Sequence, residues 1–376
     1  MEQDMTGILR REEQVTLYLR GLYERYGYRK YRMGRFEEYD LYLENKNFLK
    51  SPNIITFHDL DGRVLALKPD VTLSIAKNTH ATAQSSEKFY YQENIYRLDK
   101  PSGGYREISQ IGLEYIGSLG LIPTYEVLSL AQKTLSAISG RHRMQLSHMG
   151  FLVSLLDGLA IEATARGELL ECIRGKNRHE LRKYAEGKGI TPAATALLET
   201  ATDLCGEFRE TLRRARTIAI TQSMTDALNQ LAAVYDLLEA AGGTDGLVLD
   251  FSLAGDVDYY DGIVFQGYVE GVPRALLAGG YYGNLLKKFG RNLDAIGFAV
   301  YLNELNLLFR ERRKTDVDAL ILYSDGEDAA ALIRAADELA AKGVSVRLER
   351  TAPAELRYGR LYRFEAGALR EVTEDA

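Results

Sequence analysis

A long helical stretch that separates two groups of short apolar runs constrains this chain more than any other feature of its sequence. Apolar residues recur at helical spacing from residue 121 to about residue 241, where Gly242 and Gly243 supply a stop. Short apolar runs typical of strands lie before it, within residues 54–116, and after it, within residues 246–278. This grouping predicts an α+β domain with a mainly antiparallel sheet, and it disfavours a dinucleotide-binding fold of alternating strands and helices.

Three local patterns add detail to this outline. Apolar spacing predicts a helix over residues 15–26. The apolar runs at residues 54–57 and 64–67 flank an Asp-Gly pair and predict a hairpin. In the central helical stretch, Thr191-Pro192 predicts the capped start of a helix.

The C-terminal part of the chain contains the clearest domain boundary. A helical run predicted over residues 294–310 ends in the charged segment 310–314, and strand, helix and strand patterns follow it. We therefore expect one domain over residues 1–314, with a helical insert at about 151–242, and a small C-terminal α/β domain over residues 315–376.

Charge and cysteine content narrow the possible partners. Lys and Arg number 47 against 53 Asp and Glu, a net charge of −6, so a broad basic surface for nucleic acid is not expected. Cys172 and Cys205 lack zinc-site spacing, and we expect no metal site and a reducing cytoplasmic location. No signal peptide and no run of about eighteen apolar residues is present, so a membrane is not an expected partner.

Asp70 and Thr72 form the first candidate site. They occupy alternate positions after an apolar run, so on an extended chain they would face the same side and hold an ammonium group. The alternative is a helix start, in which Asp70 or Thr72 caps the run over residues 73–77. The pattern alone fits both interpretations.

A second candidate lies on two strands predicted around residues 89–96 and 109–116. Gln110 and Glu114 share strand parity, and Arg97 is expected on the same face. Gly112, between the two polar residues, would leave room for a ligand. A solvated antiparallel face explains the same alternation equally well.

Tyrosine pairs beside glycines mark two further segments, residues 255–265 and 278–284. Tyr259, Tyr260 and Tyr282 would wall a pocket and offer hydroxyl groups to a small polar aromatic ligand. Plain packing on a sheet is the alternative for each of them.

Taken in order, these segments resemble the catalytic core of the histidyl-tRNA synthetases over residues 14–309. Residues 91–114 resemble motif 2 of class II synthetases, and Asp258-Tyr259-Tyr260 resembles the histidine-binding tyrosine segment. Gly279-Gly280 resembles the glycine strand that follows, and Gly297-Phe298-Ala299 resembles the start of motif 3. The resemblance implies a class II aminoacyl-tRNA synthetase-like antiparallel sheet with flanking helices.

The departures from that family concern the cations that catalyse amino acid activation. Gly255 stands where the resemblance implies a catalytic arginine, and Glu304 stands where it implies the arginine that clamps ATP. Loss of one such donor typically lowers the rate by about 10²–10³. Gly34 replaces the proline of motif 1. The residues that the resemblance assigns to histidine binding are kept in type or charge: Asp70, Thr72, Arg97, Gln110, Glu114, Tyr259, Tyr260 and Tyr282.

This combination resembles the regulatory subunits of ATP phosphoribosyltransferase, which are paralogues of the synthetases. The resemblance implies a non-catalytic protein that partners a short-form catalytic subunit, self-associates as a dimer and binds L-histidine as its allosteric ligand, with no other cofactor. It also implies a truncated anticodon-binding domain and no tRNA. The alternatives are a divergent histidyl-tRNA synthetase and a paralogue that senses another small molecule, although Glu114 with Gln110 suits an imidazole ring.

Overall fold

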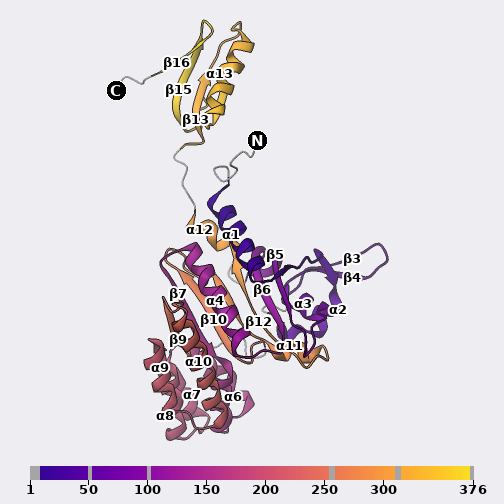
Figure 1. The fold of residues 1–376 in the computed structure, drawn as a ribbon, viewed down its shortest axis with the longest axis vertical. Helices are drawn as coiled ribbons and strands as arrows, with labels where there is room; N and C mark the ends of the chain where they lie inside the picture. The colour runs from indigo at the N-terminus through magenta and orange to yellow at the C-terminus, as the bar shows by residue number, and fades with distance from the viewer. Residues whose placement is uncertain (1–8, 50–52, 100–102, 254–258, 310–314, 373–376) are drawn as a thin grey trace. The chain divides into compact units, whose positions relative to one another are not determined.

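Two units make up the chain, Met1–Phe309 and Arg310–Ala376, and each is described here by itself (Figure 1). The computed structural model describes residues 9–49, 53–99, 103–253, 259–309 and 315–372. The boundary expected at residue 314 lies in the segment 310–314, which is outside the described residues.

A nine-stranded sheet forms the centre of the first unit. Its strand order is β1-β5-β6-β12-β11-β10-β7-β9-β8. Two neighbouring pairs, β1 with β5 and β7 with β9, are parallel, and the other pairs are antiparallel. The predicted, mainly antiparallel α+β sheet is therefore present. The strands are β1 (Arg29–Lys30), β5 (Glu87–Asp99), β6 (Gly104–Gly117), β7 (His142–His148), β8 (Cys205–Gly206), β9 (Leu247–Asp250), β10 (Ile263–Val269), β11 (Leu277–Tyr281) and β12 (Asp294–Tyr301).

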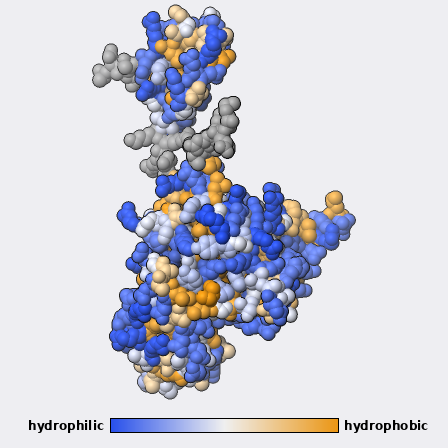
Figure 2. Space-filling model, viewed as in Figure 1, coloured by the Kyte–Doolittle hydropathy of each residue, from blue (hydrophilic) through white to orange (hydrophobic). Residues whose placement is uncertain are grey.

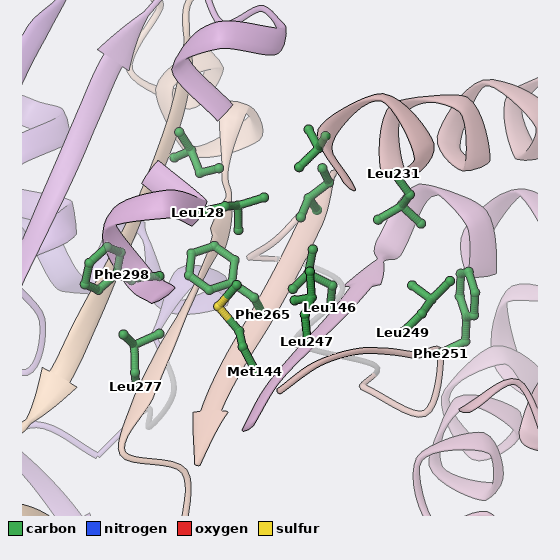
Figure 3. Packing of buried hydrophobic residues seen from close by; sticks show 14 of the residues in the cluster. Leu128, Met144, Leu146, Leu231, Leu247, Leu249, Phe251, Phe265, Leu277 and Phe298 are labelled. Carbon is green, nitrogen blue, oxygen red and sulfur yellow. The ribbon is translucent and has the colours of Figure 1, made fainter. Parts of the chain in front are cut away.

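One face of this sheet is covered by the larger hydrophobic core. Helices α1 (Arg11–Arg25), α4 (Leu121–Ile138), α5 (Met149–Gly158) and α10 (Gln222–Ala240) contribute to it. Leu128 of α4 lies over Phe265 and Phe298 of the strands, and Leu231 of α10 belongs to the same cluster (Figure 3). These side chains are almost fully buried.

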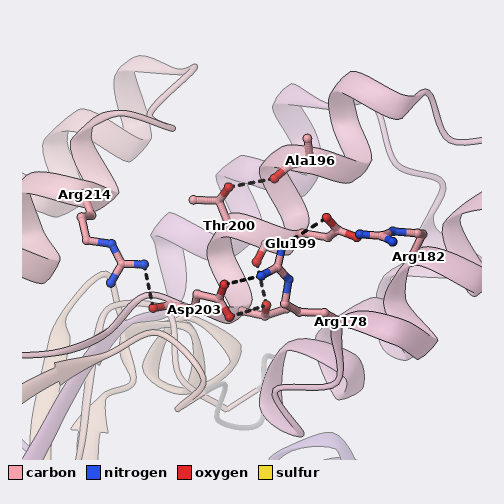
Figure 4. A network of polar contacts seen from close by, with 8 residues as sticks. Arg178, Arg182, Ala196, Glu199, Thr200, Asp203 and Arg214 are labelled. Atoms are coloured by element: carbon pink, nitrogen blue, oxygen red, sulfur yellow. Dashed lines mark hydrogen bonds and ion pairs between the residues drawn. The ribbon is translucent and has the colours of Figure 1, made fainter.

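The helical insert continues with α6 (Ala163–Arg174), α7 (Arg178–Gly187), α8 (Pro192–Thr202) and α9 (Phe208–Arg216). The predicted cap of α8 is confirmed, because Thr191 Oγ1 accepts a hydrogen bond from the amide of Ala194 at 3.3 Å. Glu199 of α8 accepts from Arg182 at 2.7 Å and from Arg178 at 3.4 Å, which ties α8 to α7 (Figure 4).

The opposite face of the sheet carries a second, smaller core. A three-stranded sheet of order β2-β4-β3 belongs to this region, and its β3 and β4 form the predicted antiparallel hairpin. Gly62 in the hairpin turn has φ +82°, a conformation that favours glycine. The elements here are β2 (Phe36–Glu38), α2 (Tyr39–Glu44), the 3₁₀ turn Lys46–Phe48, β3 (Thr56–His58), β4 (Val64–Leu67), α3 (Thr72–Asn78) and α11 (Gly283–Lys288).

Two strands correct the sequence predictions. Strand β7 lies inside the stretch expected to be helical, and β12 occupies the first half of the helical run expected at residues 294–310. Only the shorter helix α12 (Leu302–Leu308) follows β12. Both strands are interior, β7 between β10 and β9 and β12 between β6 and β11. The apolar run of β12 resembles that of a buried helix. In β7, Met144 and Leu146 alternate with polar residues, but this short strand lies within a stretch that is otherwise helical.

The C-terminal unit is a small α/β domain, as the sequence predicts. Its sheet has the order β14-β13-β15-β16, and α13 begins at the cap Asp328. Ile321, Leu332 and Phe364 form its buried core. The elements are β13 (Val317–Leu322), α13 (Ala329–Ala341), β14 (Val346–Glu349), β15 (Tyr358–Glu365) and β16 (Ala368–Glu371). In both units, no helix within the described residues is long and apolar enough to cross a membrane.

Candidate functional site

A cavity lies on the sheet face that carries the smaller core, over strands β5, β6, β12 and β11. It contains about 420 Å³ of empty space, but only about 40 Å³ admits the centre of a water molecule, so side chains enclose it closely. All eight residues predicted to bind histidine line it: Asp70, Thr72, Arg97, Gln110, Glu114, Tyr259, Tyr260 and Tyr282. The fold thus brings together residues that are up to 212 positions apart in sequence, from 70 to 282.

Small residues on neighbouring strands form the floor of this cavity. Gly297 lies opposite Glu114 in the β12–β6 pair, and a Cβ at Gly297 would overlap the Glu114 carboxylate. A Cβ at Gly280 would lie 2.7 Å from the ring of Tyr260. These glycines therefore let a carboxylate and an aromatic ring lie directly against the backbone.

The space beside Gly112 is filled differently from the prediction. Tyr91 is the cross-strand partner of Gly112, and a Cβ there would lie 2.6 Å from the Tyr91 hydroxyl. The room that Gly112 leaves is therefore occupied by the Tyr91 side chain and not by space for a ligand. Tyr91 narrows the cavity at this point.

Glu114 is the most buried carboxyl group of the cavity, with 2% of its surface exposed. Thr72 Oγ1 donates to Oε1 at 2.8 Å, and the Tyr282 hydroxyl donates to Oε2 at 2.5 Å. Burial raises the pKa of Glu114 to about 8, the two hydrogen bonds offset part of that rise, and the nearby Asp70 carboxylate adds to it. Glu114 is therefore a fixed hydrogen-bonding group that is mostly protonated near neutral pH.

Asp70 and Arg97 form an ion pair at the wall of the cavity. Arg97 donates from a terminal guanidinium nitrogen to Asp70 Oδ2 at 3.1 Å and from Nε to the carbonyl of Pro69 at 2.7 Å. Asp70 Oδ1 accepts from the amide of Leu73 at 3.0 Å. Thr72 begins α3, so the helix-start interpretation of this segment is correct and the extended one is wrong. Asp70 and Thr72 nevertheless both reach the cavity.

Three tyrosines form the aromatic wall. The rings of Tyr259 and Tyr260 lie edge to face with centroids 4.6 Å apart, and Tyr259 and Tyr282 lie 6.0 Å apart. Burial raises the pKa of each of these tyrosines well above its ordinary value, with nearby carboxylates adding to the rise. The hydroxyl groups therefore stay protonated and can donate hydrogen bonds. Gln110 of β6 is also buried and lines the same cavity.

Neither of the two positions predicted to have lost a catalytic cation, Gly255 and Glu304, is seen in the lining of the cavity within the described residues. Gly255 lies outside the described residues. Glu304 lies in the first turn of α12 and is not among the described residues that line the cavity. No group of three or more potential metal-ligating side chains occurs within the described residues.

Sequence reasoning missed Tyr91 and Tyr301, which also line the cavity. Tyr91 pairs with Gly112, and Tyr301 pairs with Gln110, so each is a cross-strand neighbour of a predicted position. The strand pairing would have identified them, but Tyr301 belongs to β12, which the sequence did not predict as a strand.

Comparisons with known proteins identify the family of this chain. The histidyl-tRNA synthetase family model matches residues 8–305. An ATP phosphoribosyltransferase regulatory subunit from Moorella thermoacetica is 32% identical over 298 residues, which cover 78% of this chain and 76% of that protein. The chain belongs to the family of ATP phosphoribosyltransferase regulatory subunits. Its predicted role as a regulatory subunit, and not as an enzyme, is confirmed by this membership.

Solved structures confirm the predicted fold class. The structure of an ATP phosphoribosyltransferase regulatory subunit/histidyl-tRNA synthetase from Bacillus halodurans aligns with a TM-score of 0.72 at 25% identity, covering 90% of this chain and 88% of that chain. A chain of the ATP phosphoribosyl transferase (HisG:HisZ) complex from Thermotoga maritima aligns with a TM-score of 0.62 at 19% identity, covering 80% and 98%. At that identity the second match shows the shared fold alone.

Proposed function

We propose that this regulatory subunit binds L-histidine in the cavity around Glu114 and transmits its occupancy to a short-form ATP phosphoribosyltransferase catalytic subunit. The observation that carries the proposal is the single cavity in which Glu114, its two hydroxyl donors and the Asp70–Arg97 pair lie together. A site of this kind offers binding groups for every polar part of an amino acid with an imidazole side chain.

The charges of the cavity fit a zwitterion. Asp70 would accept from the ligand ammonium group, and Arg97 would donate to the ligand carboxylate. These two side chains contact each other at 3.1 Å, so an inserted amino acid would exchange one ion pair for two. Both side chains are largely buried, with 10% and 13% of their surfaces exposed, which limits competition from water.

The remaining groups fit the imidazole ring. Glu114 and Gln110 would bind the two ring nitrogens, and the rings of Tyr259 and Tyr260 would pack against its faces. An aliphatic side chain would leave the buried Glu114 without a ligand partner, and this favours histidine over aliphatic amino acids.

A site that binds histidine without catalysing a reaction can regulate the activity of a partner subunit. A ligand changes the activity of a partner only if it binds two states of the complex with different affinity. Histidine is the end product of the pathway that ATP and phosphoribosyl pyrophosphate enter, so histidine bound here would supply feedback on the first step. We propose that the functional form is a dimer of this chain assembled with the catalytic subunit, and that tRNA is not a partner, in keeping with the net charge of −6.

A reconstitution experiment tests this function. The chain is mixed with a purified short-form catalytic subunit at micromolar concentration, and assembly is followed by size-exclusion chromatography with light scattering. We expect a hetero-oligomer whose phosphoribosyltransferase activity falls as histidine is added. Glu114→Ala should assemble normally and respond only at histidine concentrations at least about tenfold higher.

The exposed Glu186 on α7 provides the matched control, since Glu186→Ala makes the same truncation away from the cavity and should leave the response unchanged. Separate elution of the two proteins, together with a catalytic subunit that is fully active and fully histidine-sensitive alone, would overturn the proposal.

A further inference from the structure

Side chains at alternate positions of β12 face the cavity around Glu114, and they change from small to large along the strand. Gly297 lies opposite Glu114 in the pairing with β6. Ala299 comes two residues later, and Tyr301, the last residue of β12, takes the next position on the same face. All three line the cavity. The floor is therefore low near Glu114 and ends at a large side chain.

The neighbouring strands keep the middle of this floor low. Ala299 pairs with Ala278 of β11 on one side and with Gly112 of β6 on the other. These three positions carry at most a methyl group. The next row of the sheet instead pairs Tyr301 with Gln110. The height of the floor thus changes at Tyr301, at the end of the cavity away from Glu114.

The backbone holds Tyr301 firmly at this place. Its amide donates to the carbonyl of Leu276 at 2.8 Å. Helix α12 begins at the next residue, Leu302, and β12 itself is an interior strand. The Cα of Tyr301 cannot withdraw without disturbing the sheet or this helix. The ring can leave the cavity only by rotation of the side chain.

Tyr301 shares its end of the cavity with Tyr260 and Arg97, which also line it. Burial raises the pKa of the Tyr260 hydroxyl, the neighbouring Tyr301 adds to the rise, and Arg97 opposes it. Such effects fall with distance, so Tyr260 lies close to both residues. Arg97 is the group that would bind the carboxylate of an amino acid. Tyr301 therefore stands near the carboxyl end of the proposed ligand.

Little spare room remains in the cavity. Of its 420 Å³ or so of empty space, only about 40 Å³ admits the centre of a water molecule. A ligand with more atoms beyond its carboxyl carbon would need further space at the Tyr301 end. That space is filled by a ring on a fixed backbone, and forcing extra atoms into a packed site is unfavourable.

We propose that Tyr301 determines the specificity of this site: it admits histidine with a free carboxylate and excludes histidine amides and esters that extend past the carboxyl carbon. The inference rests on the histidine site proposed above and adds a limit on ligand length. Tyr301 acts here through the bulk of its ring and not through its hydroxyl group. The subunit would therefore respond to free histidine and not to its conjugates.

The test compares three ligands by isothermal titration calorimetry of the full chain: L-histidine, L-histidinamide and N-benzyl-L-histidinamide. The two amides both lack the carboxylate charge, and they differ only in the benzyl group. We expect Tyr301→Ala to bind the benzyl amide at least about tenfold more tightly than wild type does, and to gain less than about threefold for histidinamide. A gain of binding cannot result from damage to the fold.

Three further variants complete the test. Tyr301→Phe keeps the ring, and Tyr18→Ala removes an exposed tyrosine of α1, so both should exclude the benzyl amide as wild type does. Tyr301→Leu should show part of the gain, and it replaces Tyr301→Ala if that protein does not fold.

The outcomes separate this inference from the proposed function. If wild type binds histidine but takes the benzyl amide as tightly as histidinamide, or if neither Tyr301→Ala nor Tyr301→Leu tightens its binding, the inference is overturned alone. If wild type gives no heat with L-histidine, the proposed function fails and this inference fails with it.

Discussion

At the scale of single residues, Glu114 combines burial, hydrogen bonding and charge in one group. Its carboxyl group has 2% exposure, two hydroxyl donors and a nearby carboxylate. Because its pKa is raised to about 8, the folded protein holds a proton that the unfolded chain releases at a pH near its ordinary value of 4.5. Such a group favours ligand binding at the expense of stability.

The raised pKa of Glu114 predicts that the free energy of unfolding depends on pH. Between about pH 4.5 and 8 the unfolded chain binds fewer protons at this position than the folded chain, so the free energy of unfolding falls as pH rises. The slope contributed by Glu114 is up to about 1.4 kcal/mol per pH unit. Urea unfolding at pH 5, 6.5 and 8 should show this decline in wild type and a flatter dependence in Glu114→Gln. Equal slopes for the two proteins would show that Glu114 does not hold the proton.

We also expect Glu114 to contribute to the affinity for histidine. Loss of the Glu114 carboxyl would leave a buried imidazole nitrogen without its hydrogen-bond partner, which costs about 1–3 kcal/mol, so Glu114→Ala should weaken histidine binding by roughly tenfold or more. Isothermal titration calorimetry of the isolated chain and of its complex measures this directly, with Glu186→Ala as the exposed control. Calorimetry without any histidine-dependent heat in either form would contradict the assigned ligand.

At the scale of elements, glycines on neighbouring strands position the binding groups. Gly297 of β12 faces Glu114 of β6, and Gly280 of β11 faces Tyr260. The sheet therefore acts as a rigid floor on which the carboxylate and the ring rest. Changing one of these glycines alters the position of a functional side chain as well as the packing of the sheet.

A pair of glycine variants tests this role. Gly297→Ala should lower the free energy of unfolding by about 1–3 kcal/mol and abolish histidine binding, because the new Cβ overlaps the Glu114 carboxylate and the carbonyl of Leu113. Gly167→Ala, at an exposed position of α6 with nothing within 4 Å of the new Cβ, should raise stability by about 0.4–1 kcal/mol and leave binding unchanged. Chemical denaturation and calorimetry measure both effects. If a folded Gly297→Ala protein bound histidine as tightly as wild type, Gly297 would not be needed to position the Glu114 carboxylate.

At this scale, the strands and helices show which features could be predicted from the sequence and which could not. The eight candidate residues could be predicted to lie together because motif order, parity and resemblance agree at those positions, and the structure places them all around one cavity. Strand β12 was missed because its interior position makes nearly every residue apolar, so no alternation marks it. The contact between His148 of β7 and Gln230 of α10 could not be predicted, since it joins residues 82 positions apart in sequence.

At the scale of the whole molecule, the chain has the class II synthetase fold and the role of a regulatory subunit. Its surface is largely hydrophilic in the view of Figure 2, in keeping with a charged content of 27%. The residues that the resemblance assigns to histidine binding are kept in type or charge, while Gly255 and Glu304 occupy the places where the resemblance implies catalytic cations. The ligand site is thus separable from the chemistry of the paralogous enzymes.

The absence of the two cations predicts that the chain does not activate histidine with ATP. Two lost cations together lower the activation rate by about 10⁴–10⁶, if they act independently. Histidine-dependent exchange of pyrophosphate into ATP should therefore be undetectable above background in the purified chain. Robust exchange, sensitive to Glu114→Ala, would instead favour a divergent histidyl-tRNA synthetase.

The central claim, that histidine in the Glu114 cavity and substrate on the catalytic subunit affect each other, is tested most directly by reciprocity. The histidine dissociation constant of the reconstituted complex is measured by calorimetry with and without saturating phosphoribosyl pyrophosphate, and the substrate dissociation constant with and without saturating histidine. Linkage requires the two ratios to be equal, and we predict the same factor of at least about fivefold in both directions. A histidine dissociation constant that does not change when substrate saturates the complex would contradict the account.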